Sequence, residues 1–288
     1  MARPAPAAAK ALKIIDLLVS HRGEQFTISD IARRTGSSLG SAHAVLAVLE
    51  ESGYLARHPA RRTYGLGPAL VSAGMAALEQ HPAIRVAAER IGPLAAELEA
   101  DVVVSAGTPT EIVSVAVGGT GSRYGPGFRE GERVPLTPPL GLVFMAWAPP
   151  AEVESWLKRA PEAVDRDRVE LALTTVRERG YALGLATSAH RALKGTRAED
   201  RPATDRDVWT WTASFDDDYD LPSVDPEGEY DLGMASAPVF DADGRVLVAI
   251  TASGFSPGLS GRETVRVAEC VRACATVVTK QTRGRFPG

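Results

Sequence analysis

One stretch of the sequence, from Phe26 to Leu66, limits the possible folds more than any other. It begins with apolar residues at helical spacing directly after Thr27, whose hydroxyl can cap the free amides of a first helical turn. Gly36 follows and permits the left-handed conformation that a tight turn between two helices requires. Serines directly after this glycine can cap a second helix. The pattern therefore predicts a helix-turn-helix, with the first helix over 29–34 and the second ending near 52.

The second helix of this pair would bury one apolar stripe and leave its leading end exposed. The stripe consists of Ala42, Val45, Leu46 and Leu49. After Gly53 the pattern changes to two short apolar segments around a turn rich in arginine, which predicts a β-hairpin. A basic hairpin beside such a helix is typical of a winged helix-turn-helix, whose wing contacts DNA phosphates. The residues that this arrangement would offer to DNA are Thr27, Ser37, Ser38, Ser41, His43, Arg57, His58, Arg61 and Arg62.

Motifs spread over nearly the whole chain resemble those of the IclR (isocitrate lyase regulator) family of bacterial transcriptional regulators. The resemblance implies a winged helix-turn-helix, a linker helix and an α/β effector-binding domain similar to the GAF fold, with dimerisation mainly through the amino-terminal part. One departure is that Leu39 and Ala44 stand where relatives commonly carry a lysine and an arginine. The segments that carry the resemblance are Ala11–Ile15, Ile31–Gly36, Leu49–Tyr54, Tyr64–Gly67, Arg179–Ala182 and Ala237–Arg245.

Length and charge agree with a two-part protein. A chain of 288 residues exceeds the usual size of one domain. Through Leu66 the chain carries a net charge of +4, whereas the whole chain carries −4, so the remainder carries about −8. A basic module on an acidic body suits a protein that binds DNA by one end. The predicted α+β chain has a winged helix-turn-helix over 1–67, a linker helix over 68–82 and an effector-binding domain over 83–288.

Helical segments flank the helix-turn-helix on both sides. After the wing, a run of helix formers is interrupted by Pro82 and by Gly92-Pro93, which predicts two or three helical pieces. The first piece is apolar and is a candidate dimer contact. Before the wing, a helix is predicted over 8–20, and the residues predicted for its inner face are Leu12, Ile15, Leu18 and Val19.

The effector-binding domain alternates between strand and helix patterns. A polar segment over 188–229 interrupts these patterns and holds Trp209 and Trp211, which would either form an aromatic lid over a ligand or pack on the sheet as a cover. The predicted strands are 102–105, 111–117, 233–240 and 246–253, and the predicted helices are 142–147, 152–159, 166–179 and 261–280.

The family resemblance also implies a pocket for a small molecule. It would be lined by Leu140 and Gly141 at a helix start, by Met234, and by the hydroxyls of Thr251 and Ser253. Hydroxyls and free amides suit a ligand rich in hydrogen-bond acceptors, such as a carboxylate or a polyketone, and an aromatic lid would admit a ligand larger than a keto acid. The expected effector is therefore a carboxylate or an aromatic compound.

Two motifs resemble a catalytic site and a metal site, but each lacks a residue that its function requires. Gly254–Gly258 has the GxSxG pattern of a serine hydrolase, but Pro257 has no N–H for an oxyanion and no histidine follows His190. The acidic run Asp216–Asp220 lacks the glycine that a calcium loop requires, since Leu221 stands there. We therefore predict no catalytic residue, no cofactor and no metal.

The predicted partners are a double-stranded DNA operator, a small-molecule effector and further copies of the chain, in a homodimer or homotetramer. No stretch is long and apolar enough for a membrane span, so a cytoplasmic location is expected. Two alternatives remain open. The chain could be an enzyme or small-molecule carrier that uses its amino-terminal helices only for oligomerisation, or a regulator that binds DNA without responding to an effector.

Overall fold

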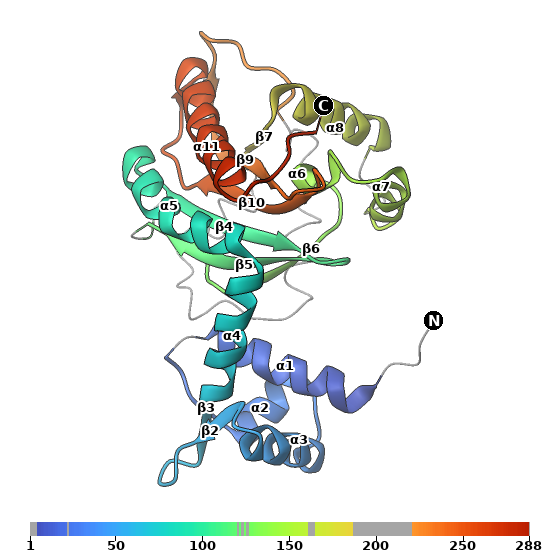
Figure 1. Ribbon diagram of the computed structural model, residues 1–288, viewed down its shortest axis with the longest axis vertical. Helices are drawn as coiled ribbons and strands as arrows, with labels where there is room; N and C mark the ends of the chain where they lie inside the picture. The colour runs from blue at the N-terminus through green and yellow to red at the C-terminus, as the bar shows by residue number, and fades with distance from the viewer. Residues whose placement is uncertain are drawn as a thin grey trace. The chain divides into compact units, whose positions relative to one another are not determined.

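The computed structural model describes residues 5–21, 23–119, 121, 124, 127–160, 165–186 and 221–287. The chain divides into two compact units, Met1–His81 and Pro82–Gly288 (Figure 1). Within the described part of the chain, no helix has the length and apolar character needed to span a membrane.

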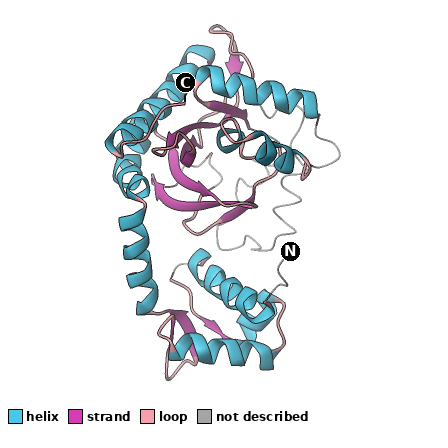
Figure 2. Cartoon of the chain, turned by 45° about the vertical axis from the view of Figure 1, so that its right-hand side comes forward, coloured by secondary structure: helices cyan, strands magenta, loops and turns pink. Residues whose placement is uncertain are grey.

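The first unit is a helix-turn-helix with a β-hairpin wing, as predicted. Its three-stranded antiparallel sheet has the order β1-β3-β2, so the wing hairpin is extended by a short strand that the sequence did not reveal (Figure 2). The helices are α1 (Pro6–Ser20), α2 (Ile28–Thr35), α3 (Leu39–Glu51) and α4 (Pro68–Gln80), and the strands are β1 (Phe26–Thr27), β2 (Leu55–Arg57) and β3 (Thr63–Leu66).

The core of this unit corrects the predicted orientation of α1. The helix buries Ile14, Leu17 and Leu18, whereas Leu12 is 62% exposed. The error arises because α1 is apolar at so many positions that two different stripes fit helical spacing. On α3, by contrast, the predicted stripe is buried as expected, with Val45 at its edge.

The second unit is built on a six-stranded sheet with the order β6-β5-β4-β10-β9-β7, in which all neighbours are antiparallel. A separate pair of short strands, β8 and β11, lies outside this sheet. The strands are β4 (Asp101–Gly107), β5 (Glu111–Gly118), β6 (Arg133–Pro135), β7 (Ala182–Leu185), β8 (Glu229–Tyr230), β9 (Leu232–Phe240), β10 (Val246–Ser253) and β11 (Leu259–Ser260), and the helices are α5 (Pro82–Leu98), α6 (Leu142–Met145), α7 (Pro150–Leu157), α8 (Arg166–Arg179) and α11 (Gly261–Gln281). The expected α+β class is confirmed.

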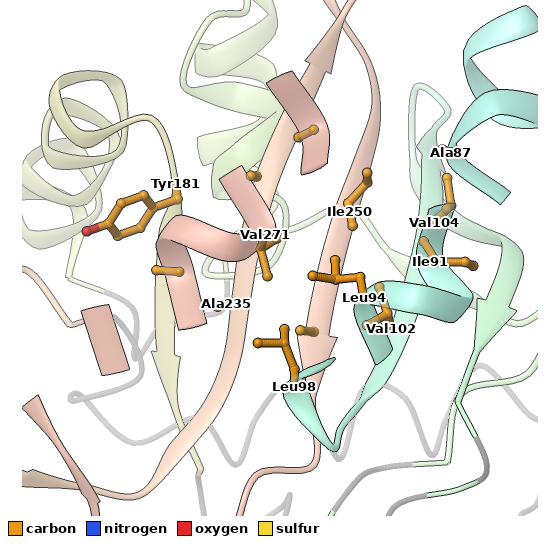
Figure 3. Packing of buried hydrophobic residues seen from close by; sticks show 14 of the residues in the cluster. Ala87, Ile91, Leu94, Leu98, Val102, Val104, Tyr181, Ala235, Ile250 and Val271 are labelled. Atoms are coloured by element: carbon orange, nitrogen blue, oxygen red, sulfur yellow. The ribbon is translucent and has the colours of Figure 1, made fainter. Parts of the chain in front are cut away.

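Helices cover both faces of the six-stranded sheet. On one face α5 and α11 pack against alternate residues of the central strands, such as Val102, Val104 and Ile250 (Figure 3). On the other face α6 and α8 form a second apolar cluster that includes Ala249 of β10. Because residues alternate along a strand, the neighbours of Ala249 at positions 251 and 253 face this second side as well.

Two local expectations in this unit were wrong. The run of helix formers divides before Pro82 as predicted, but α5 continues through Gly92-Pro93 instead of breaking there. Both residues lie on its exposed side, while Ile91 and Leu94 are buried against the sheet, so packing outweighs the one backbone hydrogen bond that proline removes. The helix expected to open over 142–147 does begin at Leu142, but it ends at Met145.

The polar segment rejoins the sheet at a defined point. Trp209, Trp211 and Asp216–Asp220 lie outside the described residues. At Leu221 the backbone N–H donates to the carbonyl of Leu183 on β7, at 3.1 Å, and Arg179 donates to the Leu221 carbonyl at 2.6 Å. The Leu221 side chain is buried in the core between the sheet and α11.

Candidate functional sites

Thr27 and Asp30 fix the start of α2. The Thr27 hydroxyl accepts from the Asp30 amide at 3.3 Å, and the Asp30 carboxylate accepts from the Thr27 amide at 3.2 Å, which forms a capping box. Hydrogen bonds from the Thr27 hydroxyl and from Arg33 lower the pKa of the Asp30 carboxyl below its ordinary value. Thr27 therefore serves first as a helix cap, whatever further contact it makes.

The turn after α2 sets the position of α3. Gly36 has φ 65°, which side chains rarely adopt, and its amide and that of Ser37 close the helix end on carbonyls of α2. Ser38 then caps α3, because its hydroxyl accepts from the Ser41 amide at 3.3 Å. The leading end of α3 is thus held rigidly, with Leu39 and His43 exposed.

The Ser41 hydroxyl has a partner that the sequence did not reveal. It accepts a hydrogen bond from the ammonium group of Lys10, which comes from α1. Both residues are half-buried. A cation from one helix therefore lies against the first turn of another, and the Ser41 hydroxyl retains its own proton and one lone pair for other contacts.

Two contacts within the wing hairpin involve its arginines. Arg57 lies over the Tyr64 ring, with its Cζ 5.7 Å from the ring centroid. At the tip, His58 Nδ1 accepts from the Arg61 amide at 3.2 Å. Arg57, Arg61 and Arg62 are exposed, and His58 is half-buried.

On the second unit, the predicted hydroxyls lie on the sheet face that α6 and α8 cover. Thr251 and Ser253 alternate with residues of the core between the sheet and α11, and both are buried. Ser236 stands opposite Thr251 on β9, and their hydroxyl oxygens are 2.7 Å apart. Met234 stands opposite Ser253 in the same register, so these four side chains share one face.

Ser253 is the most unusual member of this group. It is 1% exposed, and its hydroxyl has no hydrogen-bond partner among the residues that the structure describes. An unpaired buried hydroxyl costs free energy, so such groups are usually satisfied. This atom can donate to a molecule bound on the face.

Leu140 and Gly141 lie in the segment that leads into α6. The Leu140 carbonyl accepts from the Trp156 indole at 3.0 Å, which ties the segment to α7. Gly141 has φ 90°, a backbone conformation that residues with a side chain rarely adopt, so glycine is favoured there. Helix α6 packs on β9 and β10, which places this segment on the sheet face of Thr251 and Ser253.

Comparison with known proteins agrees with the geometry of the first unit. Residues 7–59 match the family model described as the IclR helix-turn-helix domain. The first unit carries an IclR helix-turn-helix domain. The family resemblance of the motifs within these residues is confirmed.

Solved structures of IclR proteins share the fold over nearly the whole chain. An IclR transcriptional regulator from Alicyclobacillus acidocaldarius is 19% identical with a TM-score of 0.67, and the match covers 97% of this chain and 100% of that one. The Thermotoga maritima IclR is also 19% identical, with a TM-score of 0.57 and coverage of 96% and 98%.

A third solved structure is of a protein with a bound small molecule. An IclR homologue from Microbacterium hydrocarbonoxydans, in complex with 4-hydroxybenzoate, is 15% identical with a TM-score of 0.62, and the match covers 96% of this chain and 99% of that one. No curated protein sequence matches this chain.

Two polar residues near the predicted sites escaped the sequence reasoning. Ser236 lies two residues after Met234 on β9, and the strand period alone would have placed it on the same face. Lys10 left no comparable signal, because its contact with Ser41 in the IclR helix-turn-helix joins residues 31 positions apart.

Proposed function

We propose that this protein is a transcriptional regulator that binds operator DNA through its first unit and responds to a small molecule bound by its second. The observation that carries the proposal is the IclR helix-turn-helix domain. Its second helix, α3, would be the recognition helix: it is capped, its leading end is exposed, and a wing of exposed arginines lies in the same unit. The recognition helix would enter the major groove, and the wing would contact phosphates. The proposed DNA contacts are Thr27, Ser37, Ser38, Ser41, His43, Arg57, His58, Arg61 and Arg62.

Fluorescence anisotropy with the full chain tests DNA binding. The labelled duplex would carry the intergenic DNA beside the gene of this protein, and a duplex of equal length and shuffled sequence would serve as the control. We expect the intergenic duplex to bind at least about a thousandfold more tightly, the usual margin of a specific DNA-binding protein. Equal affinity for both duplexes would contradict operator recognition.

The proposed effector site is the sheet face that bears Thr251 and Ser253, together with Met234 and the Leu140-Gly141 segment. The unpaired Ser253 hydroxyl supports it, because a ligand oxygen would satisfy that donor. The solved homologue with 4-hydroxybenzoate suggests a small aromatic or carboxylate ligand for this chain as well. A ligand bound there would change the affinity of the chain for DNA.

We further propose that α4 joins two copies of the chain. This helix buries none of its residues. Its apolar residues Val71, Met75 and Leu78 form one stripe, and Val71 and Met75 are each more than 60% exposed. Val71→Glu with Met75→Glu should shift the sedimentation mass from a multiple of the chain toward a single copy. Ala73→Glu, on the opposite side of α4, should leave the mass unchanged.

The proposed regulator performs no catalysis. The rival function, an enzyme or carrier that uses the first unit only for oligomerisation, requires that the chain bind no specific DNA. The anisotropy experiment therefore separates the two functions.

A further inference from the structure

The recognition helix α3 lacks the positive charge that DNA contact usually requires. None of its thirteen residues is a lysine or an arginine. Its amino-terminal amides carry a partial positive charge, but that charge falls off within one turn. The affinity of most DNA-binding proteins depends strongly on cations that neutralise phosphates. A cation for this helix would therefore have to come from another element.

Lys10 of α1 meets this requirement. Its ammonium donates to the Ser41 hydroxyl on the first turn of α3. Ser41 can accept this bond because its amide, not its hydroxyl, is used by the Ser38 cap. An ammonium has three N–H donors, so two remain for a further acceptor. The exposed His43 lies on the same end of the helix.

We propose that Lys10 provides the cation of the recognition helix and contacts a DNA phosphate at the edge of the groove that α3 enters. This inference rests on the proposed function, because it applies only to a chain that binds DNA. The hydrogen bond to Ser41 holds the lysine side chain before DNA arrives, so less side-chain entropy is lost on binding than for a free lysine.

A purely structural role is the alternative. In that case the Lys10–Ser41 bond would only fasten α1 to α3, and its loss would lower the stability of the first unit. The two roles differ in their response to salt. A lost phosphate contact removes about 0.9 from the slope of log affinity against log salt concentration, whereas a lost internal bond leaves the slope unchanged.

The test compares three variants of the full chain: Lys10→Gln, Lys10→Arg and Lys13→Gln. Glutamine keeps a donor for Ser41 but has no charge, and arginine restores the charge. Lys13 is the matched control, because it lies on the same helix, is exposed and points away from the α1 core contacts. Anisotropy with the intergenic duplex and with a shuffled duplex would be measured from about 50 to 200 mM salt, the range over which phosphate contacts dominate.

We expect Lys10→Gln to make the slope less steep by about 0.9 for each bound copy on both duplexes. Lys10→Arg should restore the original slope, and Lys13→Gln should leave it unchanged. An unchanged slope with Lys10→Gln would overturn the proposal, and so would an equal decrease with Lys13→Gln. Thermal unfolding of each variant shows whether weaker binding follows from lost folding. If the unaltered chain binds neither duplex, the proposed function itself fails, which is a different outcome from a failure of Lys10 alone.

Discussion

The two proposed binding surfaces keep their polar groups in opposite environments. The DNA-facing side of the first unit exposes charged side chains, such as Arg61 and Arg62, to solvent. On the sheet face of the second unit, the polar side chains at the proposed contacts are the neutral hydroxyls of Thr251 and Ser253, and both are buried. Exposed charges act over about 10 Å and are screened by salt, whereas buried hydroxyls act only at contact distance.

This difference indicates a division of labour. The attraction between exposed charges and DNA phosphates does not depend on sequence and weakens with ionic strength, so sequence recognition must come from groups that reach base edges, such as His43. A buried hydroxyl such as that of Ser253 instead discriminates strongly, because leaving it unpaired in the complex costs about 1–3 kcal/mol. The first surface would supply affinity for DNA, and the second would supply selectivity for the small-molecule effector.

The largest effect is expected from the wing. Replacing Arg57, Arg61 and Arg62 by alanine should reduce the salt slope by about 2.7 for each bound copy, since three phosphate contacts are lost. Affinity should fall nearly equally on intergenic and shuffled duplexes. The matched control removes three exposed arginines of the second unit, Arg85, Arg166 and Arg262. A similar decrease in that control would mean that net charge, not the wing, determines the slope.

The next effect concerns the sheet face. If a compound is found that releases the protein from DNA, Thr251→Val with Ser253→Ala should abolish release while ligand-free DNA binding stays intact. Ser253→Ala alone should stabilise the ligand-free chain, by about 1 kcal/mol, because it removes an unpaired buried hydroxyl. Anisotropy and urea unfolding measure the two effects.

Thr264 of α11 provides the control for that experiment. Its hydroxyl is also buried without a partner among the described residues, but it lies away from the proposed site. Thr264→Val should leave release unchanged. Normal release by the Thr251 and Ser253 double variant would show that this face is not the effector site.

A smaller effect is expected from the recognition helix. His43→Ala should change which bases are preferred in a randomised operator library, by about 1–3 kcal/mol at one position. Ser41→Ala should change the preference less, because the Ser41 oxygen is already bonded to Lys10. If both variants select the sequence that the unaltered chain selects, α3 does not read bases through these residues.

The smallest effect is expected at the Thr27–Asp30 capping box. The folded-state pKa of Asp30 is lowered, so its stabilising contribution is complete above the unfolded aspartate pKa of about 3.9 and is lost as the pH falls through the lower folded value. Asp30→Asn should therefore reduce the unfolding temperature slightly at pH 7, and the difference should shrink toward pH 3. Glu24→Gln, an exposed carboxylate outside the box, should show no such trend.

The sequence predicted elements well where one periodic pattern was present. Helices α8 and α11 were found because their apolar residues fill one face. Strands β9 and β10 were found because two apolar runs flank a clear turn, and both runs are buried. Strands β6 and β7 were not predicted, because three or four residues cannot establish a period by themselves, whereas the equally short β2 and β3 flank a recognisable turn. The inner face of α1 was misjudged for the opposite reason, an excess of apolar residues.

The candidate sites show the same limit at the level of side chains. The sequence could place Thr251 and Ser253 on one face, because the strand period is a local property. It could not show that Ser253 lacks a partner or that Lys10 reaches Ser41, because both facts depend on which distant residues the fold brings near. Site residues without a local pattern can therefore be identified only from the folded structure.

The anchoring of Leu221 on β7 has a consequence for how the chain can vary in length. The Ala186 amide bonds to the Asp231 carbonyl, and Leu221 bonds to Leu183, so the chain departs and returns within about 10 Å along one edge of the sheet. The entropy cost of closing a loop grows only with the logarithm of its length, at about 0.6 kcal/mol for each doubling. Segments of very different length could therefore be inserted between these two points while the sheet keeps its strand order and its register.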